Sequence, residues 1–264
     1  KPGIIEGVFF MKKTLFEKCK YLPESDEEWY IPKEALIANT ILNSFEDDQR
    51  SVIEVGVLHG AWSINILRNI HETIVYGIDP YPNMSGMRED TLNRLKDFNF
   101  TLSESWNDLV IKSSVSVVHI DGLHTEDAVY EDLVNAEKFL GEKGVIIVDD
   151  CLQPVFPGVA AGWIRFILNS DFSVFLCTGS KAYITRKKDH AFWIDRMRNA
   201  FSNQNIIPWC NHLGEDDDPA YISYPTIDGY KLLLSFDRTD PNESDPILPE
   251  WPEQPIVPMV QPKC

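Results

Sequence analysis

The chain has 264 residues, a formal net charge of -17 at pH 7 and a hydrophobic fraction of 44%. This length is sufficient for one large α/β domain with extensions. The strong negative charge repels nucleic acid phosphates and anionic lipids, so we expect neither a nucleic acid nor a membrane as a partner. The longest apolar runs are also shorter than the roughly 20 residues that a membrane helix needs. These features favour a role on small molecules.

The five cysteines are odd in number, widely spaced and without a C-x-x-C pair. Such a pattern is typical of reduced thiols rather than of a disulfide framework or a zinc site. We therefore predict a cytoplasmic protein.

Strands and helices are predicted to alternate through the middle of the chain. A helix over 33–45 begins after Pro32. Apolar, β-branched runs then predict strands over 51–56, 74–79, 99–103, 115–121 and 144–149. Helices are predicted between and after these strands, over 60–70, 87–97, 105–112, 125–140 and 158–168, with a turn at Gly141 and Gly144. Two last strands, 172–177 and 181–185, are joined by a short glycine-containing link that favours an antiparallel hairpin.

This alternation predicts an α/β fold, a Rossmann-like, doubly wound, seven-stranded and mostly parallel sheet with an antiparallel final hairpin. The predicted domain spans 33–203 and ends with a helix from Asp189. Residues 1–32 are expected to form a lid or a segment packed on the domain. Residues 204–264 are acidic and proline-rich, and are expected to form an extension that packs on the domain, with an extra strand at 230–236.

Acidic residues follow two of the predicted strands. Asp121 ends the run Val115–Asp121, and Asp149 and Asp150 end the run Gly144–Asp150. If the two strands are neighbours, the three carboxylates meet at the carboxyl edge of the sheet, where open α/β sheets bind ligands. Such a cluster repels itself unless a hard cation compensates the charge. Oxygen ligands favour magnesium, manganese or calcium over zinc, so we predict a divalent metal site, most simply for Mg2+.

The turn after the first strand predicts an adenosine ligand without phosphates. The strand ends in Glu54-Val-Gly56-Val-Leu58-His-Gly60. A dinucleotide fingerprint needs glycine where Leu58 stands, because the backbone must approach a pyrophosphate there. Asp79 ends the second strand, where a carboxylate can accept hydrogen bonds from both ribose hydroxyls.

Together, the E-x-G-x-x-x-G turn, the acid ending the second strand and the final hairpin resemble the class I S-adenosylmethionine-dependent methyltransferases over residues 33–186. The resemblance implies that the backbone of Gly56 contacts the methionine part of the cofactor and that Glu54 orients this loop. It further implies that Asp79 binds the ribose and that Ser105 contacts the adenine, although Ser103 stands where relatives usually have glycine.

A second motif indicates which group of methyltransferases the chain resembles. It consists of Asp121-Gly-Leu-His124, followed later by Asp149-Asp150. It resembles the metal-dependent sugar O-methyltransferases of the macrocin, mycinamicin and aminocoumarin type, in which such acids hold magnesium. A metal would lower the pKa of an acceptor hydroxyl, and a nearby base would remove its proton. Both Asp121 and His124 are candidates for this base. We favour His124 as the base and Asp121 mainly as a metal ligand.

Other residues have simpler interpretations. His119 is expected to be a satisfied histidine in the sheet core, and Trp163, Trp193 and Trp209 are expected to pack in the core rather than to line an acceptor site.

The expected function is therefore S-adenosylmethionine-dependent and magnesium-dependent O-methylation of a sugar or a glycosylated small molecule, as in natural product biosynthesis. The expected partner is a hydroxylated small-molecule acceptor, and the sequence leaves open whether the protein forms a homo-oligomer. Two alternatives remain. One is a catechol-type methyltransferase or a cephalosporin-hydroxylase-like enzyme on the same core. The other is a non-catalytic, cofactor-binding interaction module.

Overall fold

The computed structural model describes residues 37–38, 40–46, 50–70, 72–82, 84–178, 180–202, 226–228, 230–231 and 233–235. The predicted segment 1–32, Trp209 and most of the predicted extension 204–264 lie outside these ranges. Within them, no helix combines the length and the apolar character that a membrane span requires.

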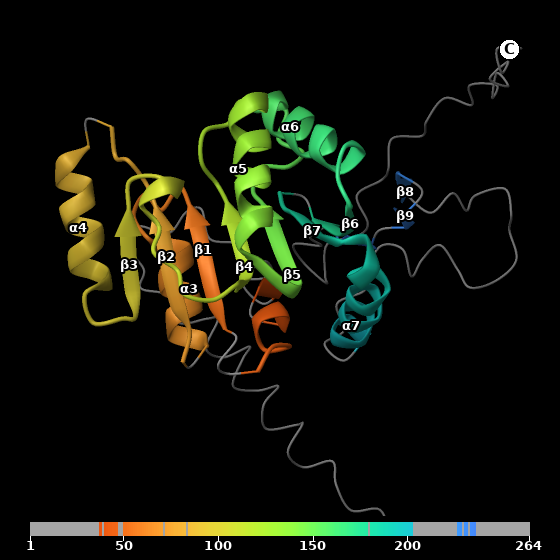
Figure 1. Ribbon diagram of the computed structural model, residues 1–264, viewed down its shortest axis with the longest axis horizontal. Helices are drawn as coiled ribbons and strands as arrows, with labels where there is room; N and C mark the ends of the chain where they lie inside the picture. Colours follow the sequence, from red (N-terminus) through yellow and green to blue (C-terminus); the bar gives the residue numbers. More distant parts are fainter. Residues whose placement is uncertain are drawn as a thin grey trace, which may run out of the picture.

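An eight-stranded sheet runs through the described part of the chain (Figure 1). Its strands are β1 (Ser51–Val55), β2 (Ile74–Ile78), β3 (Phe100–Ser103), β4 (Val115–Ile120), β5 (Leu140–Val148), β6 (Phe172–Thr178), β7 (Ala182–Arg186) and β10 (Leu233–Ser235). The helices are α3 (Ala61–Asn69), α4 (Ser85–Leu95), α5 (Glu126–Phe139), α6 (Pro157–Leu168) and α7 (His190–Ser202), with single 3-10 turns η2 (Trp106–Asp108) and η3 (Lys187–Asp189). A separate pair consists of β8 (Thr226–Ile227) and β9 (Tyr230–Lys231).

The strand order is β10-β6-β7-β5-β4-β1-β2-β3. β7 lies between β5 and β6 and runs antiparallel to both, whereas the other neighbouring strands are parallel. The predicted seven-stranded fold is therefore confirmed, including its final hairpin. β10 adds an eighth strand at the edge, within the stretch 230–236 where an extra strand was predicted.

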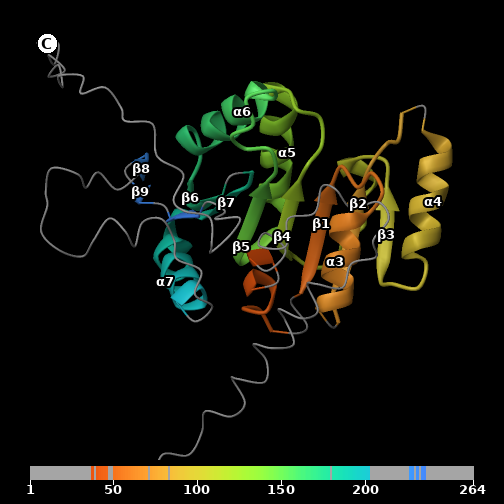
Figure 2. The same cartoon turned by 180° about the vertical axis from the view of Figure 1, so that it is seen from behind.

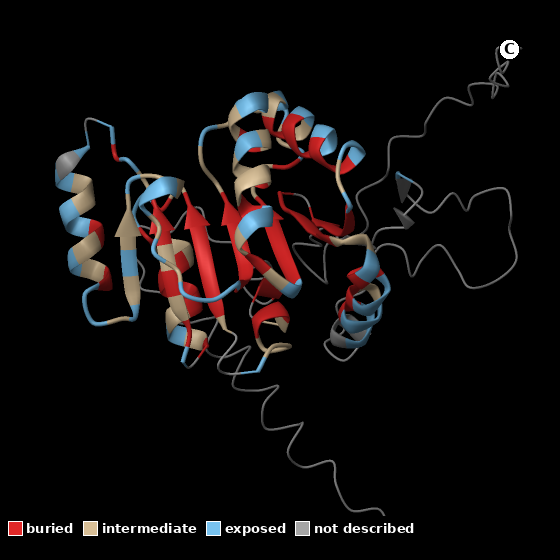
Figure 3. Cartoon of the chain, viewed as in Figure 1, coloured by how far each residue is buried: buried red, intermediate tan, exposed pale blue. Residues whose placement is uncertain are grey.

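Helices cover both faces of the sheet. Viewed from opposite sides, α5 and α6 lie over one face, and α3, α7 and the first described helical residues lie over the other (Figures 1 and 2). Each face has its own hydrophobic cluster, one with Leu133 and Phe166, the other with Ile41, Ile66 and Trp193. Every residue of the central strands β1 and β4 is buried, as their red ribbons in Figure 3 show. This burial explains why the strands are continuous apolar runs.

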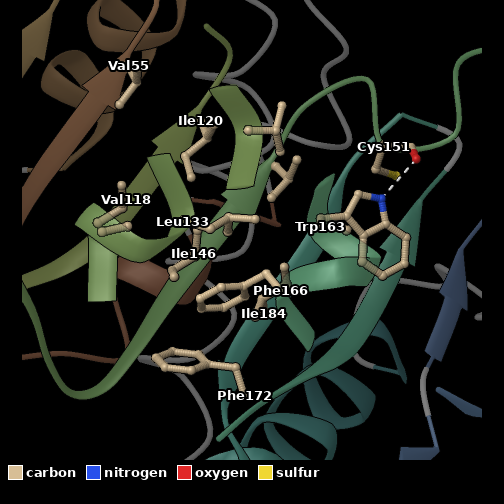
Figure 4. Packing of buried hydrophobic residues seen from close by; sticks show 14 of the residues in the cluster. Val55, Val118, Ile120, Leu133, Ile146, Cys151, Trp163, Phe166, Phe172 and Ile184 are labelled. Carbon is tan, nitrogen blue, oxygen red and sulfur yellow. Dashed lines mark hydrogen bonds between the residues drawn. The ribbon is translucent and has the colours of Figure 1, made fainter. Parts of the chain in front are cut away.

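Two of the three tryptophans that were predicted to lie in the core do so. Trp163 is buried in the same cluster as Leu133 and Phe166, and its Nε1 donates a hydrogen bond of 3.0 Å to the carbonyl oxygen of Cys151 (Figure 4). Trp193 is fully buried, and its Nε1 donates to the carbonyl oxygen of Lys143 at 2.9 Å. Neither side chain is available to line an acceptor site.

Two local predictions were wrong. The helix predicted over 105–112 is only the 3-10 turn η2, because the backbone adopts an extended conformation at Leu109. The turn predicted at Gly141 and Gly144 lies inside β5, where Lys143 takes a left-handed φ of 54°. The pairing of β4 with β5 shifts register at this irregularity, which absorbs the extra residues.

Gly56 brings the loop after β1 into contact with the loop after β4. Its φ is 81°, in the left-handed region that favours glycine. A Cβ at this position would lie 1.9 Å from the carbonyl oxygen of Asp121, which no side chain tolerates. Backbone hydrogen bonds continue the contact, since the N–H of Asp121 donates to the carbonyl oxygen of Val55 at 2.9 Å.

We predict that Gly56→Ala lowers the free energy of unfolding by about 3 kcal/mol or more, because it adds both backbone strain and overlap with Asp121. Urea denaturation would measure this change. Gly86→Ala is the matched control, since a Cβ at Gly86 has no neighbour within 4 Å and the helix α4 gains about 1 kcal/mol of propensity. Equal effects of the two substitutions would contradict the proposed contact.

Candidate active site

The carboxyl ends of β1, β2, β4 and β5 position the predicted site residues. Glu54 on β1 pairs in register with His119 on β4. Asp121 directly follows β4, and Asp149 directly follows β5, where its N–H donates to the carbonyl oxygen of Ile120 at 2.9 Å. The expectation that the two acidic strand ends are neighbours is therefore correct.

Asp79 organises the predicted cofactor loop. Its Oδ2 accepts the backbone N–H of Leu58 at 3.0 Å, and its Oδ1 accepts that of Tyr81 at 2.8 Å. The hydroxyls of Tyr81 and Thr91 both donate to the carbonyl oxygen of Leu58 at 2.6 Å. Each carboxylate oxygen of Asp79 retains a second lone pair, so the half-buried carboxylate can still accept ribose hydroxyls.

Glu54 lies on β1, just before the predicted cofactor loop, and its side chain points into the interior. It is 2% exposed, and its Oε2 accepts a hydrogen bond from the hydroxyl of Ser63 on α3. Its Oε1 lies 3.8 Å from Nδ1 of His119, and burial raises the pKa of the Glu54 carboxyl. The Glu54 carboxylate therefore links β1 to α3 and β4, and its predicted role of orienting the loop stays a prediction. Ser105 lies at the start of η2, where its hydroxyl donates to Oδ2 of Asp108 at 2.6 Å.

Asp121, His124 and Asp150 form one group whose ligand atoms all lie within 4.8 Å of one another. Nε2 of His124 lies 3.5 Å from Oδ1 of Asp121 and 3.4 Å from Oδ2 of Asp150. The imidazole packs on the ring of Phe156, with 4.2 Å between the ring centroids. Asp150 has a left-handed φ of 52°, which turns it away from the direction of β5.

The charges of this group influence one another. The hydrogen bond that His124 can donate to the Asp121 carboxylate raises the pKa of His124, although partial burial opposes this shift. Burial, followed by the charges of Asp149 and Asp121, raises the pKa of Asp150. This repulsion is the condition that a bound cation would relieve. Two carboxylates suit Mg2+ or Mn2+, and an imidazole nitrogen is also acceptable to Mn2+ and other transition ions, so the donor set fits a divalent metal.

Asp149, the remaining predicted metal ligand, is not part of this group. Its Oδ2 forms an ion pair with Nζ of Lys181 and lies 3.7 Å from Nε2 of His119. Burial alone would raise the pKa of Asp149, but the charges of Lys181 and His119 hold it well below its usual range. His119 is buried as predicted, and its ring stacks on Trp62 with 4.2 Å between centroids. The prediction that it is satisfied was wrong for one ring nitrogen, because Nδ1 has no hydrogen-bond partner among the described residues.

Sequence reasoning missed Lys181 and Phe156. Lys181 is a single lysine next to an apolar strand, and it becomes informative only when β7 is known to lie beside β5. Phe156 precedes Pro157, the first residue of α6, so its position near His124 depends on how α6 packs. Gly158 allows that packing, because a Cβ there would lie 2.8 Å from the carbonyl oxygen of His124.

A half-buried acid, Asp132, contacts η2 from α5. Trp106 donates its Nε1 hydrogen to Oδ1 of Asp132 on α5 at 2.7 Å, and its ring stacks on Phe139 with 5.7 Å between centroids. Burial is the main cause that raises the pKa of Asp132, to about 6. This contact holds the chain that follows Ser105.

Comparison with known proteins agrees with this geometry. Residues 53–151, from β1 through the Asp149-Asp150 pair, match the family model of a methyltransferase domain. This match supports the resemblance to the class I S-adenosylmethionine-dependent methyltransferases, and the strand order of the sheet agrees with the fold that the resemblance implies. No curated protein matches the chain at a significant level.

Several solved structures are similar to the chain. An O-methyltransferase from Bacillus cereus in complex with SAH is 13% identical with a TM-score of 0.47, over 69% of this chain and 90% of that one. A TDP-rhamnose 3'-O-methyltransferase of calicheamicin biosynthesis is 13% identical with a TM-score of 0.46, over 69% and 95%. The O-methyltransferase NovP is 14% identical with a TM-score of 0.49, over 66% and 88%.

The raised pKa of Asp132 predicts a pH-dependent stability. Between the unfolded pKa of about 3.9 and the folded pKa of about 6, the folded protein binds more protons, so stability falls as the pH rises through this window. Asp132→Asn keeps an acceptor for Trp106 but removes the titration. The variant should gain about 2 kcal/mol relative to the parent between pH 4 and pH 7.

Urea denaturation at several pH values would test this expectation, with Asp97→Asn as the control because Asp97 is exposed. A difference between the Asp132→Asn variant and the parent that is constant with pH, or that shrinks as the pH rises, would show that the Asp132 carboxyl is already ionised in the fold.

Proposed function

We propose that this protein transfers the methyl group of S-adenosylmethionine to a hydroxyl oxygen of a small molecule, a sugar or a glycosylated compound, with the help of a divalent cation. The observation that carries the proposal is the contact between Gly56 and Asp121. It places the predicted cofactor loop directly against the backbone of the residue whose side chain joins His124 and Asp150. A methyl donor on one loop would therefore be adjacent to an acceptor held by the other.

The chemistry requires a nucleophilic oxygen. An alkyl hydroxyl is too weakly acidic to ionise at neutral pH, and a divalent ion held by Asp121 and Asp150 would lower its pKa and fix its orientation. Nε2 of His124 lies between the two carboxylates and can accept the hydroxyl proton. Asp121 makes His124 a stronger base, because its carboxylate stabilises the imidazolium that proton transfer creates.

Apolar side chains next to the acids support a ring-shaped acceptor. Leu123 is 69% exposed, and Val155 is 74% exposed in the segment that follows Asp150. Leu152 in the same segment is 46% exposed. These side chains can contact the apolar face of a sugar or the aglycone of a glycoside, while the acids receive its hydroxyl.

We expect S-adenosylhomocysteine to bind metal-stripped protein with micromolar affinity in isothermal titration calorimetry. Asp79→Ala should weaken this binding by tenfold or more, because it removes the ribose acceptor and releases the N–H groups of Leu58 and Tyr81. Asp97→Ala removes an exposed carboxyl and is the control. Absence of any binding to the parent protein would exclude the methyltransferase function.

We further expect Mg2+ to stimulate the release of S-adenosylhomocysteine in a screen of glycosides and catechols. His124→Gln should lower kcat by about 100-fold or more while leaving S-adenosylhomocysteine affinity unchanged, because it removes the base but not the cofactor contacts. Asp150→Asn should abolish the stimulation by Mg2+. Full activity of both variants would rule out the proposed roles of this group, and activity on catechols alone would favour a catechol-type enzyme.

A further inference from the structure

Lys181 places a buried cation beside the strand that carries the acidic pair. It directly precedes β7, and its N–H donates to Oγ1 of Thr178 at 2.9 Å. The N–H of Thr178 in turn donates to the carbonyl oxygen of Lys181 at 2.8 Å, which closes the hairpin. The Lys181 side chain is 8% exposed. The hairpin therefore holds an ammonium group in the interior, next to β5.

The ammonium of Lys181 binds one oxygen of Asp149, and the backbone binds the other. Oδ2 of Asp149 forms the ion pair with Nζ of Lys181, and Oδ1 accepts the N–H of Asp150 at 2.8 Å. Nζ of Lys181 also lies 3.3 Å from Nε2 of His119. Two consecutive acids thus have separate partners, since Asp150 faces His124 while Asp149 faces Lys181.

We propose that Lys181 is a positioning residue that retains Asp149 in this ion pair and thereby limits the carboxylate ligands of the metal to Asp121 and Asp150. The inference rests on the proposed function, which supplies the cation. It adds that Lys181 determines how many carboxylates bind this cation and therefore the charge of the metal site. A site with two carboxylates binds divalent ions more weakly than one with three, because ligand charge tunes affinity.

The energetic reason lies in the burial of the ammonium. If Asp149 turned toward a cation held by Asp121 and Asp150, the buried Lys181 would lose its carboxylate partner. Separating the two charges of a buried ion pair is strongly unfavourable, because the ammonium then loses part of its compensation in the interior. The ion pair is therefore the stable state of Asp149, and Lys181 lowers the affinity of the neighbouring site for cations.

Mn2+ binding to the metal-stripped full chain, measured by electron paramagnetic resonance of the free ion, tests this inference. Asp149→Asn should change the Mn2+ affinity by less than about threefold, whereas the matched change Asp150→Asn should lower it by about tenfold or more. Lys181→Met should raise it by about tenfold, because the freed carboxylate becomes a third acidic ligand. The double variant Lys181→Met/Asp149→Asn should return to the parental affinity.

A purely structural role of Lys181 would weaken Mn2+ binding when the lysine is removed, so a gain that depends on Asp149 distinguishes the two roles. Equal losses in Asp149→Asn and Asp150→Asn would overturn the inference, and this comparison decides the question if Lys181→Met does not fold. An unchanged affinity in folded Lys181→Met, or a gain that persists in the double variant, would also overturn it.

The same experiment separates this inference from the proposed function. If the parent protein binds S-adenosylhomocysteine but no Mn2+, the proposed role of a metal in the parent fails. The inference would then still be supported if the Lys181→Met variant binds Mn2+ and the double variant Lys181→Met/Asp149→Asn does not. It would be overturned if the Lys181→Met variant binds no Mn2+.

Discussion

The close approach of Gly56 to the carbonyl oxygen of Asp121 is the constraint on which the site depends. It joins two loops that follow adjacent parallel strands, and it leaves no space for any side chain between them. The distance between the predicted cofactor loop and the acidic group is therefore set by backbone rather than by flexible side chains. Asp79 and Tyr81 hold the far end of this predicted cofactor loop at Leu58, so both ends of the loop are fixed.

Beneath these loops, charged side chains occupy the interior of the sheet edge. Glu54, His119 and Lys181 are all buried, and Asp149 contacts two of them. Buried charges are tolerated only when they are paired, so each member restricts the position of the others. The acids at the strand ends consequently form two sets. One set balances charge inside the fold, and the other, Asp121 and Asp150 with His124, faces the region proposed for chemistry.

Much of the fold was predictable because buried parallel strands have a clear signature. Every strand from β1 to β7 was anticipated, and the acids ending β4 and β5 pointed to the correct edge of the sheet. Predictions failed where distant contacts decide local structure. The chain after Ser105 follows the bond from Trp106 to Asp132, which lies 26 residues away. The separate partners of Asp149 and Asp150 depend on a left-handed backbone at Asp150 and on a lysine from the hairpin, and neither is visible in the acidic pattern.

The place of β7 between β5 and β6 has a consequence for the order in which the protein is made. Residues 53–151 contain the whole methyltransferase match and both acidic strand ends, but Lys181 is synthesised later. Until the hairpin inserts beside β5, Asp149 lacks the ammonium that compensates its burial. A nascent chain that stops before the hairpin would therefore have an exposed sheet edge at β5, next to an uncompensated carboxylate. The hairpin of β6 and β7 covers this edge and also supplies the ammonium that balances the charge of Asp149.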